Sequence, residues 1–89
     1  RVRNGTRNFC LEPAMTASEA HQALDAGIEM AADAARDSCR IAGYGEMGIG
    51  NTTSASAIAA ALTGLAAELV VGRGTGAPDE MLIRKTAVI

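Results

Sequence analysis

A glutamate stands directly before a run of glycines and small polar residues, and this combination predicts chemistry on a phosphate ester. The run is Glu46-Met47-Gly48-Ile49-Gly50-Asn51-Thr52-Thr53. Gly48 and Gly50 carry no side chain that would keep a ligand away from the backbone. The polar residues that follow, beginning with Asn51, are typical caps of a helix start, where amide N–H groups point outward and bind anions. We therefore expect a phosphate site here, and Glu46 is a candidate for contact with the reacting part of the ligand.

A second glycine-rich segment, Gly72-Arg73-Gly74-Thr75-Gly76, is another candidate for a phosphate contact. Alternating glycines can fold into a nest of N–H groups around phosphate oxygens, although the same spacing also fits a flexible connector. Arg73 can point toward a ligand or away from it. Likewise, Glu46 is either an active-site acid or a solvent-facing loop acid, and Lys85 either contacts a ligand or faces solvent.

These motifs, followed by Arg84-Lys85, resemble the nicotinate-nucleotide:dimethylbenzimidazole phosphoribosyltransferase family of cobalamin synthesis. Gly5-Thr6-Arg7-Asn8-Phe9 and Pro13-Ala14-Met15 also resemble the segment that leads into that family's central helix. The resemblance implies an enzyme that moves the phosphoribosyl group of nicotinate mononucleotide to 5,6-dimethylbenzimidazole and that forms a homodimer at full length. The competing hypothesis is a non-catalytic module, of α/β fold, that binds a nucleotide or phosphate.

The resemblance also implies the roles of individual residues. Glu46 is expected as a catalytic carboxylate, although the glutamate usually credited as the base lies further toward the family's C-terminus. Lys85 is expected to contact the nucleotide phosphate or ribose. The expected substrate-binding residues are Met47, Gly48, Ile49, Gly50, Asn51, Thr52, Gly72, Arg73, Gly74, Thr75, Gly76 and Lys85. Pro78-Asp79 stands where the family often has two acids.

The elements around the motifs predict an α/β fold. The chain is expected to be the helix-rich part of a Rossmann-like parallel-sheet domain with three α/β/α layers. Residues 39–44 are short and apolar enough to be a buried strand, and residues 52–63 follow a helical pattern that Gly64 ends. Residues 68–71 are a weaker candidate, as a strand or a loop. This alternation would place the ligand loops at strand ends.

Two more helices are expected. Thr16-Ala17-Ser18-Glu19 is a capping box that starts the first one, and Pro78 is expected at the first position of the last one. Small and apolar residues recur along the first helix at spacings of three and four and are expected to pack on the sheet. They are Ala20, Leu24, Gly27, Ile28, Ala31 and Ala35.

Composition excludes several classes of protein. The net charge of -2 and the pI of about 5.2 argue against nucleic-acid binding. The apolar run from Ala55 to Val71 is too interrupted to span a membrane, and no secretory leader precedes it, so we expect a cytoplasmic protein. Cys10, Cys39 and the lone His21 do not have the spacing of metal ligands, and no residue requires a metal or cofactor.

Two further expectations concern the whole chain. Gly43 to Gly48 formally matches a dinucleotide-binding fingerprint, but Ile49-Gly50-Asn51 delays the helix that the fingerprint requires, so the match is judged accidental. Enzymes of the resembled family are several times longer than this chain, which starts without Met. We therefore expect residues 1–89 to be a single partial domain, an internal excerpt that is inactive alone.

Overall fold

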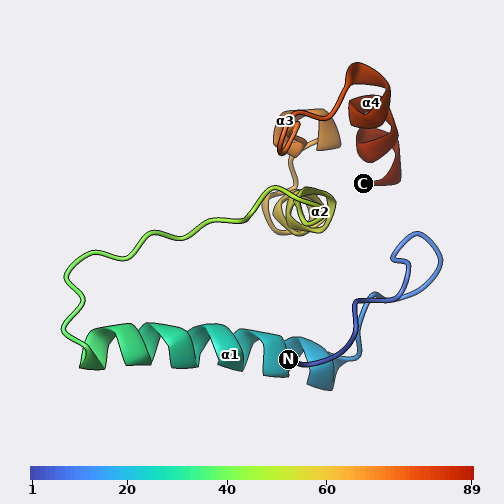
Figure 1. The fold of residues 1–89 in the computed structure, drawn as a ribbon. Coiled ribbons are helices and arrows are strands. Elements are labelled where there is room, and N and C mark those ends of the chain that lie inside the picture. Colours follow the sequence, from blue (N-terminus) through green and yellow to red (C-terminus); the bar gives the residue numbers. More distant parts are fainter. The chain divides into compact units, whose positions relative to one another are not determined.

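The computed structural model describes residues 1–89 and contains four helices and no strand (Figure 1). The helices are α1 (Ala17–Arg36), α2 (Thr52–Thr63), α3 (Ala67–Val70) and α4 (Asp79–Val88). The chain divides into two compact units, Arg1–Gly43 and Tyr44–Ile89. The first unit contains α1, and the second contains the other three helices together with both glycine segments.

The start of α1 confirms the predicted capping box. The Thr16 hydroxyl accepts a hydrogen bond from the Glu19 amide at 3.2 Å, and the Glu19 carboxylate accepts one from the Thr16 amide at 2.7 Å. Arg3 and Arg7 also lie within ion-pair distance of Glu19, at 3.0 and 3.6 Å. The Thr16 amide lowers the pKa of Glu19 below its ordinary value, and the two arginines act in the same direction. This acid therefore ties the N-terminal segment to the first turn of α1.

The end of α1 has a feature that the sequence did not indicate. Ser38 adopts a left-handed backbone with φ of 59°, a conformation that usually belongs to glycine. The Ser38 amide donates to the Ala35 carbonyl at 3.1 Å, and the Cys39 amide donates to the Ala34 carbonyl at 2.9 Å. These two bonds form a Schellman motif, which satisfies carbonyls that the helix end leaves open.

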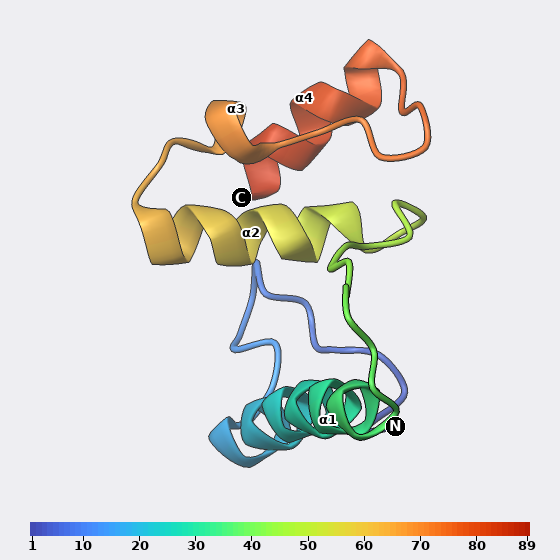
Figure 2. The same cartoon turned by 90° about the vertical axis from the view of Figure 1, so that its left-hand side faces the viewer.

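In the second unit, α2 has the bounds and the ending that its sequence predicts. Gly64 closes it with φ of 70°, and its amide donates to the Ala60 carbonyl. The hydroxyl of buried Ser56 donates to the Val70 carbonyl at 2.9 Å and so attaches α3 to α2. Contacts also join α3 to α4, and both lie on the same side of α2 (Figure 2).

The predicted strands are wrong for this chain. Residues 39–44 have no regular structure, and the side chains of Ile41 and Tyr44 are 89% and 88% exposed. Residues 68–71, expected as a strand or a loop, fall mostly in the short helix α3 (Ala67–Val70). A strand needs a neighbouring strand to pair its amides and carbonyls, and neither segment has one here. The sheet of the predicted α/β fold is therefore absent from this structure, which is helical.

Two smaller expectations also need correction. Pro78 is the N-cap of α4, so the helix begins at Asp79, one residue later than predicted. The apolar stripe of α1 is not covered by a sheet: Leu24 and Ile28 are each 66% exposed.

No apolar side chain of the chain is fully buried, and the two buried residues, Ser56 and Lys85, are both polar. None of the four helices combines the length and apolar character that a membrane crossing requires.

Candidate anion site

The two glycine segments lie against each other in the second unit. The Thr75 amide donates to the Gly48 carbonyl at 3.2 Å. Gly48 and Gly74 both have positive φ, of 79° and 57°, and a Cβ on Gly74 would lie only 2.6 Å from the Gly48 oxygen. Gly74 therefore has to be glycine because another part of the backbone approaches it closely.

Asn51 occupies the N-cap position of α2, but its side chain does not cap the helix as its residue type predicted. Its side-chain oxygen instead accepts from the Gly48 amide at 3.0 Å, which closes the turn before the helix. No side chain forms a capping hydrogen bond at the N-terminus of α2. The first amides of α2 are thus left without a side-chain partner, and the helix dipole places partial positive charge at the same end.

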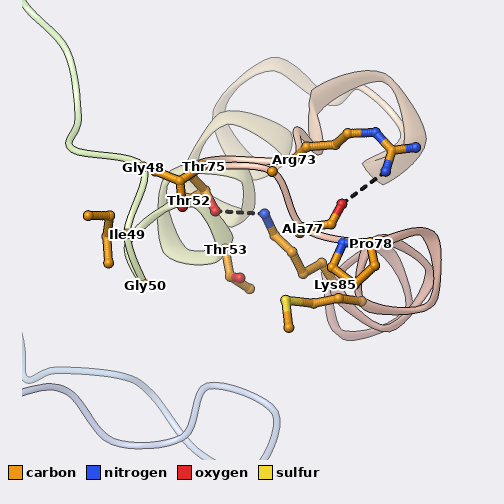
Figure 3. A pocket seen from close by; sticks show the side chains of 12 residues that line it. Gly48, Ile49, Gly50, Thr52, Thr53, Arg73, Thr75, Ala77, Pro78 and Lys85 are labelled. Atoms are coloured by element: carbon orange, nitrogen blue, oxygen red, sulfur yellow. Dashed lines mark hydrogen bonds between the residues drawn. The ribbon is translucent and has the colours of Figure 1, made fainter.

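Lys85 does not face solvent, which was one of the two alternatives that the sequence left open. It is only 8% exposed, and its ammonium donates to the Thr52 hydroxyl and to the Gly72 carbonyl, each at 2.6 Å (Figure 3 shows the first of these bonds). One bond reaches the first residue of α2 and the other reaches the second glycine segment. Neither partner is charged, so these contacts do not neutralise the ammonium. A buried charge is costly unless an opposite charge compensates it, which makes this a favourable place for an anion.

A cavity of about 450 Å³ opens beside Lys85 (Figure 3). Its lining contains two basic residues and no acidic residue. The lining residues are Gly48, Ile49, Gly50, Thr52, Thr53, Arg73, Thr75, Gly76, Ala77, Pro78, Met81 and Lys85. The cavity thus combines a helix N-terminus, two glycine segments and a buried ammonium, all of which favour a negatively charged ligand.

Most of the predicted binding residues meet at this cavity. Eight of them line it, whereas Asn51, Gly72 and Gly74 are not part of the lining but contact Gly48, Lys85 or Thr52. Glu46 and Met47 are exposed and do not belong to the lining. The structure therefore brings most of the predicted binding residues together at one cavity and does not bring the Glu46 carboxylate to them.

The lining also includes residues that their sequence context did not single out. Met81 precedes Lys85 by one helical turn, a spacing that places two residues on the same face of α4. Ala77 and Pro78 directly follow the second glycine segment. These spacings were visible in the sequence, but nothing in the residue types themselves indicated ligand binding.

Arg73 lines the cavity and is held by its own loop. Its guanidinium donates to the Ala77 carbonyl at 2.9 Å and to the Asp79 carboxylate at 2.5 Å (Figure 3 shows the first of these bonds). The Arg73 carbonyl in turn accepts from the amides of Gly76 and Ala77, at 3.2 and 2.8 Å. Arg73 therefore closes the loop that runs from the second glycine segment to α4.

This arrangement makes the cavity a candidate anion-binding site, of the class that suits a phosphate group. Comparison with known proteins gives the family: a family model described as phosphoribosyltransferase matches residues 1–89. The chain belongs to this phosphoribosyltransferase family, which confirms the resemblance of its motifs. No solved structure gives a significant match.

Individual relatives agree with the family match. The nicotinate-nucleotide–dimethylbenzimidazole phosphoribosyltransferase of Geobacter sulfurreducens is 52% identical over all 89 residues, which are 25% of that protein. Proteins with the same name from Thermus thermophilus and Cupriavidus taiwanensis are 51% and 46% identical, again over the whole chain, which covers 27% and 26% of their lengths. The chain thus spans about a quarter of the length of these curated relatives.

Proposed function

We propose that this chain supplies the phosphate and ribose cradle of a nicotinate-nucleotide:dimethylbenzimidazole phosphoribosyltransferase. The observation that carries the proposal is the buried Lys85 ammonium, which has uncharged partners and lies beside a cavity built from two glycine segments and the N-terminus of α2. The names of the relatives supply the substrates. A mononucleotide has the negatively charged phosphate that such a cavity favours.

In the proposed reaction, a ring nitrogen of dimethylbenzimidazole attacks the anomeric carbon of nicotinate mononucleotide. The bond between that carbon and nicotinate breaks as the new bond forms, and attack from the opposite face gives α-ribazole phosphate. The second ring nitrogen loses its proton to a carboxylate base. Holding the two heterocycles in line across the ribose supplies much of the acceleration, and the base supplies a further part.

We assign the substrate-binding role to both glycine segments and to Lys85, acting on the ligand directly or by holding a neighbour in place. The residues are Met47, Gly48, Ile49, Gly50, Asn51, Thr52, Gly72, Arg73, Gly74, Thr75, Gly76 and Lys85. Glu46 is proposed as an active-site carboxylate near the ribose, with the main base in another part of the protein. In that case the exposed segment that carries Glu46 approaches the cavity when the rest of the site is present.

We also propose that the 89 residues are a single partial domain of a longer chain. That longer chain is called the intact protein here. The intact protein would have a Rossmann-like parallel sheet in three α/β/α layers and would form a homodimer. The exposed apolar stripe of α1, with Leu24 and Ile28 each 66% exposed, supports a covering element that this chain does not supply. A parallel sheet is the covering element that α/β proteins use for such helices.

Lys85→Met in the intact protein tests the function, because methionine fills a similar volume and carries no charge. We expect the dissociation constant for nicotinate mononucleotide to rise about 10- to 100-fold, since hydrogen bonds from a charged group contribute about 1.5–3 kcal/mol. The Michaelis constant for dimethylbenzimidazole should stay within about twofold of its original value. Calorimetry and steady-state kinetics measure the two effects.

Arg84→Met is the matched control, because Arg84 is the exposed neighbour on α4 and pairs with Glu80. This control should bind the nucleotide normally. Equal losses in the two variants would argue against a phosphate contact by Lys85. The non-catalytic alternative predicts nucleotide binding without any formation of α-ribazole phosphate, and a general anion site would bind inorganic phosphate as tightly as the nucleotide.

A further inference from the structure

Arg73 and Lys85 are the two basic residues of the cavity lining, and their surroundings differ. Lys85 is buried and donates to uncharged groups, whereas the guanidinium of Arg73 is exposed and already donates to the Asp79 carboxylate. Asp79 therefore compensates the charge of Arg73, and nothing in contact compensates that of Lys85. The uncompensated positive charge next to the cavity belongs to Lys85.

The contacts of Arg73 join the two ends of one loop. Its carbonyl accepts from the amides of Gly76 and Ala77, while its side chain reaches the Ala77 carbonyl and the first residue of α4, Asp79. Gly74 and Gly76 lie between these contacts, with φ of 57° and 107°. Glycines lose more conformational freedom on ordering than any other residue, so a loop that contains them has much to gain from being held closed.

We propose that Arg73 and Asp79 form a clasp that presets the loop from Gly74 to Ala77 for an anion. In this role Arg73 is a positioning residue, and the phosphate is held by Lys85 and by backbone amides. The clasp rests on the proposed function for the identity of its ligand, a nucleotide phosphate. Its effect on the loop itself follows from the contacts alone. A preset loop binds more tightly because less freedom is lost when the ligand arrives.

Removal of the Asp79 carboxylate distinguishes a clasp from direct ligation of the phosphate by Arg73, because the two roles change the affinity for the nucleotide in opposite directions. If Arg73 ligated the phosphate, Asp79→Ala would release the guanidinium and remove a negative charge, so an anionic nucleotide would bind equally well or more tightly. If Arg73 is a clasp, the same substitution loosens the loop. Nicotinate mononucleotide should then bind the intact protein about three- to tenfold more weakly.

Glu80→Ala is the matched control for this substitution. Both acids lie in the first turn of α4 and both are exposed, but Glu80 pairs with Arg84 instead of Arg73. Each variant therefore removes one negative charge from the same helix end and leaves alanine behind. The double variant Arg73→Ala with Asp79→Ala should bind no more weakly than Arg73→Ala alone, because both changes open the same clasp. Asp79→Glu should restore part of the lost affinity.

Amide hydrogen exchange provides a readout that does not depend on the ligand. Without nucleotide, Asp79→Ala should speed exchange at Gly76 and Ala77, and Glu80→Ala should not. Unchanged exchange in Asp79→Ala, or binding that matches the Glu80→Ala control or is tighter, would overturn the clasp. If the intact protein failed to bind the nucleotide while exchange still rose in Asp79→Ala, the clasp would stand and the proposed function would fall.

Discussion

A single buried lysine organises the candidate site at the residue scale. Lys85 links the first residue of α2 to the second glycine segment through two hydrogen bonds of 2.6 Å. Its ammonium is thus fixed where the helix dipole and the glycine amides also favour negative charge. Glu46, the other residue proposed to act in the reaction, is exposed and does not belong to the cavity lining. The roles proposed for Lys85 in binding and for Glu46 in catalysis therefore lie at different places, and each can be tested separately.

Glu46→Gln in the intact protein should reduce turnover much more than it weakens nucleotide binding. The charge is proposed to act on the ribose and heterocycle during reaction, and such roles are commonly worth about 10²- to 10⁴-fold in rate. Steady-state kinetics and calorimetry measure the two quantities. Glu68→Gln, at an exposed acid of α3, is the isosteric control and should leave both unchanged. Turnover of Glu46→Gln within twofold of the original would remove Glu46 from the active site.

At the scale of elements, the ends of the helices were predicted better than the contacts between them. The capping box at Thr16 and the glycine ending at Gly64 depend on residues only a few positions apart, so the local sequence determines them. The segment 39–44 needed a distant strand as partner, which local sequence cannot supply. Burial of Lys85 and the diversion of Asn51 to Gly48 depend on how loops and helices meet. Residue type alone could not indicate either one.

Ser38→Gly should stabilise the end of α1. Ser38 has φ of 59°, and a side chain in this left-handed conformation costs about 1–2 kcal/mol that glycine avoids. Part of this gain is offset because glycine is more flexible in the unfolded chain, so we expect a net gain of about 0.5–1 kcal/mol. Circular dichroism of a peptide covering residues 14–41 measures the resulting rise in helix content.

Ser18→Gly in the same peptide is the control, because Ser18 lies inside the first turn of α1. There the same chemical change should lower the helix content, since glycine disfavours a helix interior. A fall in helix content for Ser38→Gly as well would show that the Schellman motif does not form at the end of α1.

At the scale of the whole molecule, the chain has secondary structure without an apolar core. No apolar side chain is fully buried, and large ones such as Leu62 and Ile41 are 82% and 89% exposed. Burial of apolar surface is the main favourable term in folding, so these helices lack the usual source of cooperative stability. The α/β prediction expected a sheet to cover the apolar stripe of α1, and the structure has helices but no sheet.

The 89 residues expressed alone should therefore unfold without a sharp transition and should catalyse no phosphoribosyl transfer. A denaturant melt followed by circular dichroism measures the first property, and an assay for α-ribazole phosphate measures the second. The intact protein, as the control, should unfold cooperatively and be active. A cooperative melt of the 89 residues together with measurable transfer would contradict the proposal that they form part of a larger domain.

The contact between Gly48 and Gly74 has a consequence for inheritance and for protein design. A Cβ at position 74 would lie 2.6 Å from the Gly48 oxygen, so the two motifs fit together only as a matched pair. Lineages that carry a side chain at position 74 should therefore have a different backbone path around position 48, because the 2.6 Å approach is to a carbonyl oxygen that every residue type has. A designer who grafts the first motif onto a new scaffold should bring the second with it, because the Gly48 carbonyl accepts its hydrogen bond from the Thr75 amide of the second.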